Sequence, residues 1–200
     1  MSNKEIIWNY LYQKLQNPYS VAALMGNLKA ESGLNPKLAN GVSKLGLTSI
    51  EYTKAVDEGS ISFDNDGIAY GLVQWYYHAR KKALLDFAKS KNKSVGDIHI
   101  QLDYMWEEIK TYKSVYNILL NADNIETPCD TVMFKYEKPS NTSQTMVLRR
   151  RGFAKDFFNA FYKPLTTEIK IKKSSAKELF ERLKGENLWV VILGLSLDME

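Results

Sequence analysis

Apolar residues recur at helical spacing near the start of the chain. Trp8, Leu11, Tyr12 and Leu15 fall at positions i, i+3, i+4 and i+7, so they lie on one face of a helix. The pattern ends near Asn17. The spacing therefore predicts a first helix that buries this face.

A second helix is predicted directly after the first. Asn17 followed by Pro18 is typical of a helix N-cap and a first helical residue. Gly33 and Pro36 are expected to end this helix, because glycine favours the C-terminal cap and proline does not continue a helix. The apolar face of the helix consists of Val21, Leu24, Met25 and Leu28.

The pattern changes between residues 40 and 71. Gly, Ser, Thr and Asn alternate there with short apolar stretches such as 61–63, which predicts a loop region with a small β-hairpin. Helical spacing then returns, so the sequence predicts an α+β domain that is mainly α. The further apolar stripes are Ala83, Leu84, Phe87 and Ala88; Leu102, Met105, Trp106 and Ile109; Cys129, Val132, Met133 and Tyr136, after a start at Thr127-Pro128; and Ala154, Phe157, Phe158 and Phe161.

The C-terminal part of the chain has a different pattern. Pro164 and the polar stretch 166–173 are expected to break the helix, and Ser175 with Glu178 predicts a capping box for a short helix that ends at Gly185. We therefore expect a domain over 1–164, followed over 165–200 by a linker, a short helix and an apolar segment. The apolar run 188–197 is about half as long as a membrane-spanning helix, so no membrane span is expected.

Composition limits the possible classes of protein. The 200 residues suit one ordinary domain with an appendage, and 44% apolar with 25% charged residues is typical of a folded globular chain. The net charge of +4 is a weak indication of an anionic polymer as partner and shows no obvious cluster for nucleic acid, so no nucleic acid is expected. Asn9, Tyr10 and Gln13 interrupt what would be the apolar part of a secretion signal, so synthesis in the cytoplasm is expected.

Glu31 is the most informative polar residue of the second helix. It follows Leu24 by seven residues and Leu28 by three, so it continues the apolar face towards the core or a cleft. Burial and the negative end of the helix dipole both favour the protonated carboxyl there, which is the form that a general acid needs to protonate a glycosidic oxygen. The alternative is a carboxyl at a helix end that turns outwards to water.

The chain contains the segments 25–36 (MGNLKAESGLNP), 69–75 (AYGLVQW) and 134–139 (FKYEKP). In this order they resemble motifs of the phage tail lysozymes, relatives of goose-type lysozymes and lytic transglycosylases. Residues 25–36 resemble the opening motif of the family. Residues 69–75, followed by the basic helix start 80–82, resemble the second motif. Residues 134–139 resemble a late motif, and together the resemblance covers about 5–163.

The resemblance implies a lysozyme-like helical domain with a small β-hairpin lobe and a substrate cleft. It implies that Glu31 is the catalytic Glu, that Gln74 lines the cleft, and that Tyr136 and Glu137 belong to the late motif. It also implies cleavage of the β-1,4 bond between N-acetylmuramic acid and N-acetylglucosamine in peptidoglycan. Attack by water would make the protein a hydrolase, and attack by the muramic 6-hydroxyl would make it a lytic transglycosylase; the sequence leaves both open.

The position of Glu137 is notable apart from the resemblance. It lies four residues after Met133 on the predicted helix that Pro139 ends, so it is again a carboxyl at a helix end beside an apolar face. A structural ion pair or a buried hydrogen bond is the alternative to a catalytic role.

The segment 64–67 (DNDG) supplies candidates for a second carboxylate. An inverting hydrolase needs a base across the sugar from the acid. Either Asp64 or Asp66 could be this base, and Asp66 is the predicted catalytic residue. A calcium loop is excluded, because Val73 would occupy the position of the bidentate Glu. Formation of a local turn is the alternative.

Aromatic residues surround Gln74. Alternation along a strand would direct Gln74 away from Trp75, so Gln74 is favoured for hydrogen bonding to an N-acetyl or hydroxyl group. Trp75 is either a core residue or a cleft wall, and Tyr70, Trp75, Tyr76 and Tyr77 cannot all line one cleft. The candidate substrate-binding residues are Tyr70, Gln74, Trp75 and Tyr136.

The two histidines, the cysteine and a run of three arginines are expected to have structural roles. His78 and His99 lack metal-ligand spacing, and Cys129, the single cysteine, is expected to be a buried thiol, so neither a metal nor another cofactor is expected. The run 149–151 of three arginines is interpreted as a solvated helix face, with binding of anionic wall polymers as the alternative.

The resemblance also predicts where the protein acts. Peptidoglycan is the expected partner, together with other phage tail proteins, and the expected place of action is the bacterial cell wall, as part of a virion tail or a similar device, also within a prophage. A wall-binding or tail-structural module that has lost catalysis is the alternative, and Glu31 argues against it.

Overall fold

The computed structural model describes residues 1–185, without the side chains of 163–172, 175 and 178–185. The chain forms two compact units, 1–161 and 162–200. The first unit contains the helices α1 (Asn3–Leu15) to α7 (Glu126–Thr131), the small lobe with the paired strands, and every residue that lines the cavity described below. The predicted apolar segment 188–197 lies outside the described residues.

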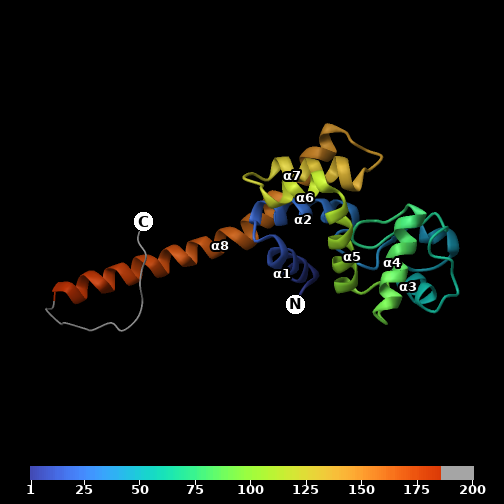
Figure 1. The fold of residues 1–200 in the computed structure, drawn as a ribbon, viewed down its shortest axis with the longest axis horizontal. Helices are drawn as coiled ribbons and strands as arrows, with labels where there is room; N and C mark the ends of the chain where they lie inside the picture. The colour runs from blue at the N-terminus through green and yellow to red at the C-terminus, as the bar shows by residue number, and fades with distance from the viewer. Residues whose placement is uncertain (186–200) are drawn as a thin grey trace. The chain divides into compact units, whose positions relative to one another are not determined.

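The first two helices confirm the sequence prediction (Figure 1). Helix α1 spans Asn3–Leu15 and starts with a capping box between Ser2 and Glu5. Helix α2 spans Pro18–Ser32, and the side chain of Asn17 accepts hydrogen bonds from the backbone N–H groups of the first turn. Gly33 caps the C-terminus of α2 with φ of +63°, a left-handed conformation that glycine adopts without strain.

Helix α2 lies in the centre of the first unit. It packs against α1, against α7 (Glu126–Thr131) and against the π-helical turn η2 (Val132–Glu137). Its residues 20–28 are all buried. Because α2 is surrounded in this way, a polar side chain on it reaches either the core or an internal cavity.

A small lobe follows α2. Strand β1 (Ala39–Asn40) pairs antiparallel with β2 (Ala69–Tyr70), with Ala39 opposite Tyr70, and the 3-10 turn η1 (Val42–Leu45) lies between them in sequence. The predicted small antiparallel sheet is therefore confirmed, but the prediction of a strand at 61–63 is wrong.

The same lobe contains a helix that the sequence analysis missed. Helix α3 spans Ser49–Asp57, where a loop was predicted. A capping box between Thr48 and Glu51 starts it, and the buried side chains of Tyr52 and Val56 attach it to the lobe. These two apolar residues are too few to form a clear stripe, because the helix is short.

The remaining helices are α4 (His78–Ser90), α5 (Ile98–Thr111), α6 (Lys113–Leu120) and α8 (Gln144–Gly185). In Figure 1, α5 stands between the group of α1, α2 and α7 and the lobe with α3 and α4. Pro164 and the stretch 166–173 were predicted to break the helix, with a separate short helix capped by Ser175, but α8 continues through all of these residues. An internal proline removes one hydrogen bond and can bend a helix without ending it. The boundary at 164 and the role of 165–200 stay predictions.

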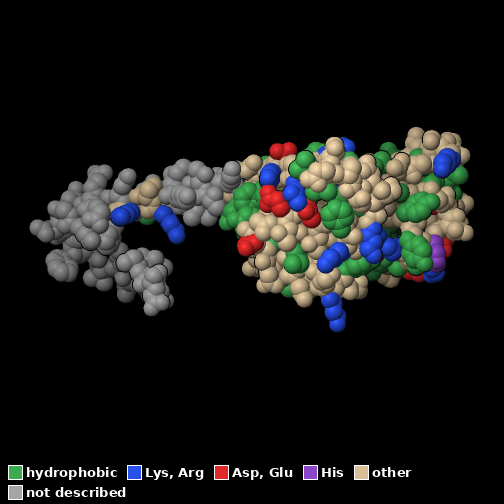
Figure 2. Space-filling model, turned by 90° about the horizontal axis from the view of Figure 1, so that it is seen from above, with side chains coloured by type: hydrophobic (Ala, Val, Ile, Leu, Met, Phe, Trp, Pro, Cys, Tyr) green, Lys and Arg blue, Asp and Glu red, His purple; other side chains and the backbone are tan. Residues whose placement is uncertain are grey.

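The surface shows mixed charge. On the face seen in Figure 2, Lys and Arg side chains are interspersed with Asp, Glu and apolar groups. Among the described residues, no helix is long and apolar enough to cross a membrane.

Candidate active site

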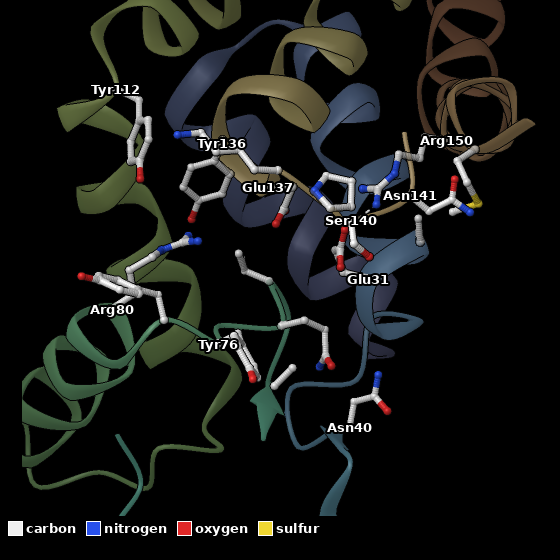
Figure 3. A pocket seen from close by; sticks show the side chains of 18 residues that line it. Glu31, Asn40, Tyr76, Arg80, Tyr112, Tyr136, Glu137, Ser140, Asn141 and Arg150 are labelled. Atoms are coloured by element: carbon white, nitrogen blue, oxygen red, sulfur yellow. Dashed lines mark hydrogen bonds and ion pairs between the residues drawn. The ribbon is translucent and has the colours of Figure 1, made fainter. Parts of the chain in front are cut away.

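A cavity of about 790 Å³ lies in the first unit. This size is within the roughly 300–1,000 Å³ that is usual for ligand sites. Figure 3 shows side chains entering it from several elements. The lining residues come from the end of α2, the paired strands and the turn after them, the starts of α4 and α8, Tyr112 between α5 and α6, and the segment 136–141, which comprises the end of η2 and the residues after it.

Glu31 lies in the last turn of α2 and lines this cavity. Its side chain is 17% exposed and pairs with the guanidinium of Arg150. The next residue, Ser32, donates its hydroxyl hydrogen bond to the carbonyl oxygens of Leu28 and Leu72, at 3.1 and 2.9 Å. These contacts hold the end of α2 against the turn 71–74, so Glu31 enters the cavity from a rigid support.

Glu137 enters the same cavity from η2, as Figure 3 shows. The π-helical turn ends at Glu137, and Lys138 follows with φ of +51°. Short π-helical insertions occur frequently at functional sites, because the wider turn redirects the side chains next to it. The carboxyl oxygen Oε1 of Glu137 is shielded from solvent and has no hydrogen-bond partner within the described residues.

The environment of Glu137 favours its protonated form. Burial raises the pKa of this carboxyl well above its ordinary range, and the charge of Glu31 raises it further. The positive charges of Arg80 and Arg150 act in the opposite direction without offsetting the rise. The cavity therefore contains a carboxyl whose protonated form is favoured more strongly than that of an ordinary glutamate.

Another carboxyl, that of Glu108, differs from Glu137 in its hydrogen bonds and in the direction of its pKa shift. Glu108 on α5 accepts two hydrogen bonds from Arg80, at 2.6 and 2.7 Å, one from the Trp75 indole at 3.0 Å and one from the Tyr136 hydroxyl at 2.6 Å. Burial alone would raise the pKa of Glu108, but Arg80, Tyr136 and Trp75 lower it below the ordinary value. Arg80 also lies over the ring of Tyr136, 5.0 Å from its centroid. Arg80 and Tyr136 of this cluster line the cavity, and Glu108 holds both from behind.

Gln74 lines the cavity from a tight turn, not from the predicted strand. The backbone N–H groups and carbonyl oxygens of Tyr70 and Trp75 bond to each other across this turn, at 3.0 and 2.9 Å. Gln74 itself has φ of +52°, which is strained for a residue with a side chain. Its amide nitrogen donates to the carbonyl oxygens of Leu38 and Gly71, while its Oε1 is buried without a partner in the part of the chain that the structure describes.

Gly71 explains how this turn is fixed to α5. It has φ of +76°, and a Cβ atom there would lie 2.6 Å from the side chain of Gln101, so only glycine fits. The buried amide of Gln101 accepts a hydrogen bond from Leu72 N–H at 2.8 Å and donates to the carbonyl oxygens of Pro36 and Val95. The side chain of Gln101, with all three of these hydrogen bonds formed, therefore fixes the turn in which Gln74 has its strained conformation.

The predicted site residues divide into two groups. Glu31, Gln74, Tyr136 and Glu137 line one cavity, whereas Asp66, Tyr70 and Trp75 are not among its lining residues. Tyr70 and Trp75 are fully buried, and the hydroxyl of Tyr70 bonds to Thr53.

Asp66 belongs to another cluster in the small lobe. Its carboxylate accepts hydrogen bonds from the ammonium of Lys81 at 2.5 Å, from the Tyr52 hydroxyl and from the backbone N–H of Ile68. Lys81 is 1% exposed and also donates to the carbonyl oxygen of Ile68. The arrangement fixes the loop 64–68 to α4, a structural role for Asp66.

The three arginines of 149–151 do not share one environment, so their interpretation as a solvated face is wrong for Arg150. Arg149 is exposed, Arg150 is 2% exposed and pairs with Glu31, and Arg151 pairs with Asp130. The sequence contained a signal for this difference. Arg150 lies three residues after Val147 and four before Ala154, both buried, so it lies on the buried face of α8.

Arg80 and Glu108 also contribute more to the site than the sequence analysis recognised. The resemblance pointed only to a basic helix start at 80–82, and Glu108 was not considered. Their pairing joins α4 to α5, and no local pattern in the sequence predicts such a contact between two helices.

The described residues contain no group of three or more His, Cys, Asp or Glu side chains that could hold a metal ion. Cys129 is buried as predicted, and burial raises the pKa of its thiol to about 12. The chemistry available in the cavity is thus that of paired carboxyls, arginines and an amide.

The comparison with protein families agrees with this geometry. The family model of the phage tail lysozymes matches residues 2–183, nearly the whole chain. No curated protein gives a significant match. The chain belongs to the phage tail lysozyme family, which gives it a lysozyme-like, cell-wall-degrading function.

Proposed function

We propose that the protein is a muramidase that cleaves the β-1,4 bond between N-acetylmuramic acid and N-acetylglucosamine. The observation that carries this proposal is the pair of carboxyls, Glu31 and Glu137, at the ends of two helical elements that border one cavity. Enzymatic cleavage of a glycosidic bond commonly depends on two carboxyl groups beside it.

Glu31 pairs as a carboxylate with Arg150; in the proposed reaction it takes up a proton and then donates it to the glycosidic oxygen. The bond to C1 of the muramic residue breaks, and N-acetylglucosamine leaves with a free 4-hydroxyl. The carboxylate that Glu31 becomes after it gives up its proton stabilises the positive charge that develops on the sugar ring. Water then adds at C1 and returns a proton to Glu31.

Glu137 is the second carboxyl of this proposal. Because burial and the charge of Glu31 raise its pKa and favour its protonated form, it donates a hydrogen bond to the bound sugar as a neutral acid. Gln74 binds through its unpartnered Oε1, which accepts a hydrogen bond from an N-acetyl N–H or a hydroxyl group. Tyr136 borders the cavity and turns its own hydroxyl to Glu108.

The cost of keeping Glu137 in this place argues against a module that only binds the wall. A carboxyl whose pKa is raised by burial destabilises the fold at neutral pH, and a glutamine there would avoid this cost. The strained backbone of Gln74, which lines the same cavity, also costs stability and therefore also argues for a catalytic site. Such features are typical of catalytic sites.

Delivery to the wall belongs to the same proposal. Membership of the phage tail lysozyme family supports association with a virion tail, with other tail proteins as partners and local penetration of the cell wall as the role. Peptidoglycan is the substrate, and the reaction described above requires no cofactor.

The test is mass analysis of the products released from purified peptidoglycan. We expect wild type to release muropeptides and Glu31→Gln to lose about 1,000-fold in rate, since the proton donor is removed. Glu58→Gln is the matched control, because it removes an exposed carboxyl outside the cavity. Reducing muramic ends would identify hydrolysis, and 1,6-anhydro ends would identify a lytic transglycosylase. Equal release by wild type and Glu31→Gln would contradict the catalytic assignment.

A further inference from the structure

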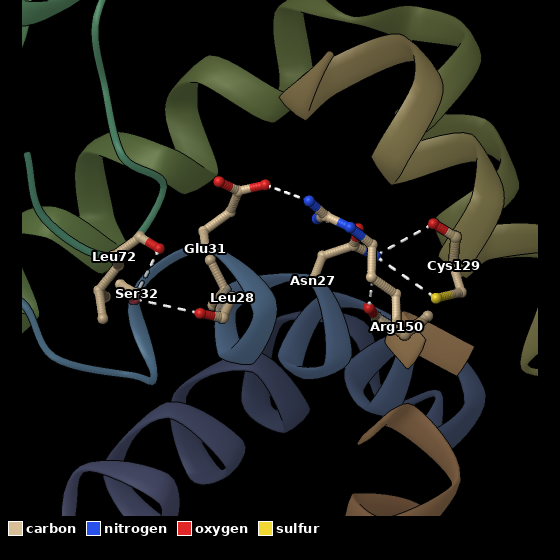
Figure 4. Close-up of polar contacts among 8 residues, drawn as sticks. Asn27, Leu28, Glu31, Ser32, Leu72, Cys129 and Arg150 are labelled. Atoms are coloured by element: carbon tan, nitrogen blue, oxygen red, sulfur yellow. Dashed lines mark hydrogen bonds and ion pairs between the residues drawn. The ribbon is translucent and has the colours of Figure 1, made fainter. Parts of the chain in front are cut away.

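Arg150 occupies an unusual position between α8 and the end of α2 (Figure 4). It is 2% exposed, and its two terminal nitrogens bond to different partners on α2. One donates to the carboxylate of Glu31, and the other donates to the side-chain oxygen of Asn27 at 2.9 Å. Asn27 and Glu31 are four residues apart, so they lie on the same face of α2 and the guanidinium spans both.

The orientation of Asn27 is itself determined by its other hydrogen bonds. Its amide nitrogen donates to the carbonyl oxygens of Ala23 at 2.9 Å and Cys129 at 3.0 Å. The side-chain oxygen is therefore the atom that remains to accept from Arg150. A continuous set of buried contacts thus runs from α7 through Asn27 and Arg150 to Glu31.

Close packing of the two helices makes this arrangement possible. A Cβ atom on Gly26 would lie 2.6 Å from the backbone oxygen of Arg150 and 2.8 Å from the Cβ atom of Ala154. Glycine at this position therefore lets α8 approach α2 closely enough for Arg150 to reach Glu31 from the side. Gly26 directly precedes Asn27, so the close approach and the hydrogen bond occur in the same turn of α2.

The arrangement is expensive if it serves only stability. A charged guanidinium that is almost fully buried loses its hydration, and replacing a whole buried ion pair by apolar side chains of similar volume is often neutral or stabilising. The Nε atom of Arg150 also has no hydrogen-bond partner among the residues that the structure describes. A functional requirement explains why an arginine lies here.

We propose that Arg150 is a positioning residue for the cleavage reaction, which holds the carboxyl of Glu31 in one orientation at the wall of the cavity through its second bond to Asn27. This inference rests on the proposed function of Glu31. Without the contact, the carboxyl of Glu31 is free to rotate about its side-chain bonds. A small misplacement of a reacting group costs about 100-fold in rate.

The charge of Arg150 has a second, separable effect. It acts on Glu137 across the cavity, where it lowers the pKa that burial and Glu31 raise. Loss of this charge therefore moves the titration of Glu137 to higher pH. A residue that only stabilised the fold would not change the turnover of folded molecules, so turnover tests the positioning role and the titration tests the charge.

The experiment compares Arg150→Lys, Arg150→Met and the control Arg149→Met, whose arginine is exposed and lies over the ring of Phe153. Turnover and KM are measured on soluble peptidoglycan fragments across pH, with the folded fraction determined by circular dichroism. We expect Arg150→Met to lower kcat about 100-fold with KM within about 3-fold of wild type. We also expect the basic limb of its pH profile to move to higher pH.

Arg150→Lys separates geometry from charge. Lysine keeps the positive charge but lacks the planar pair of terminal nitrogens that spans Asn27 and Glu31. We expect a reduced kcat with the pH profile of wild type. This variant also carries the test if Arg150→Met does not fold.

Three results would overturn the inference. Folded Arg150→Lys with the kcat of wild type would exclude a positioning role, and so would a loss in Arg150→Met that the folded fraction or KM accounts for. If wild type and Arg149→Met are both inactive on every wall, the proposed function fails, and the role of Arg150 fails with it. If wild type is active and Glu31→Gln is inactive, the proposed function holds, and the Arg150 variants then test the positioning role alone.

Discussion

Glu108 and Glu137 are two buried carboxyls near the same cavity, and their surroundings are opposite. Glu108 accepts four hydrogen bonds, from Arg80, Trp75 and Tyr136, and its pKa is lowered. Glu137 has an unpartnered oxygen within the described part of the chain, and its pKa is raised. The residue before Glu137, Tyr136, gives its hydroxyl hydrogen bond to Glu108.

The difference shows that burial alone does not determine the role of a carboxyl. Burial acts on both groups in the same direction, and the number of donors decides which form each group takes. A carboxylate with a full set of donors stabilises the site, whereas a carboxyl that lacks them stays protonated and available to a ligand. Asp66, with Lys81, Tyr52 and Ile68 as donors, belongs with Glu108.

The largest expected effect follows from removing the charge of Glu108. Glu108→Gln leaves the partly buried guanidinium of Arg80, which is 21% exposed, without its counter-ion, so we expect the free energy of unfolding to fall by about 3 kcal/mol. Denaturant unfolding measures this change. A second readout is the pH dependence: the stabilisation by Glu108 is present above the ordinary pKa of a Glu and is lost as the pH falls through its lowered pKa. A variant as stable as wild type would show that the cluster contributes little.

The sequence predicted much of the fold because most of its helices bury apolar stripes of regular spacing. The stripe and cap of α2 were enough to place Glu31 at the inner end of a helix, and the late helix end with Pro139 indicated Glu137. Helix α3 was missed because its buried face consists of few residues, although Thr48 and Glu51 form a capping box.

The polar contacts of the site were less predictable. The pairs Arg150–Glu31 and Arg80–Glu108 join residues 119 and 28 positions apart, and only the folded chain brings them together. The turn at Gln74 was predicted as a strand because the resemblance of 69–75 to the second family motif implied one. Its actual geometry depends on Gly71 and on the buried side chain of Gln101, which lies on another helix.

An effect of opposite sign and smaller size is expected for Glu137→Gln. In wild type the unfolded chain releases this proton at the ordinary Glu pKa of 4.5, while the folded protein holds it to higher pH. The stability of wild type therefore falls as the pH rises from 4.5 through the raised pKa, and each unit of difference costs about 1.4 kcal/mol. Glutamine cannot ionise, so this cost disappears.

We therefore expect Glu137→Gln to raise Tm at pH 8 by a few degrees, with little change at pH 4, together with a loss of cleavage activity. Calorimetric scans at both pH values measure the difference. A stabilised but inactive variant is the expected sign of a catalytic group that the fold tolerates at a cost. A lower Tm at pH 8 would mean that Glu137 is an ionised structural carboxylate like Glu108.

The smallest effect is expected for an exposed carboxyl, and it sets the scale for the other two. Glu107 is the neighbour of Glu108 on α5, its side chain is 58% exposed, and it pairs at 2.6 Å with Lys110 on the same helix. Such a pair is screened by water and salt, so Glu107→Gln should change the free energy of unfolding by about 0.5 kcal/mol or less, and less still in high salt. The substitution removes one negative charge from a chain of net charge +4, as Glu108→Gln also does, whereas Glu137→Gln replaces a carboxyl whose protonated form the fold favours. If Glu107→Gln shifted Tm as much as Glu108→Gln, the change in net charge would explain the effect at Glu108. If it does not, the opposite signs at Glu108 and Glu137 come from the donors that one carboxyl has and the other lacks.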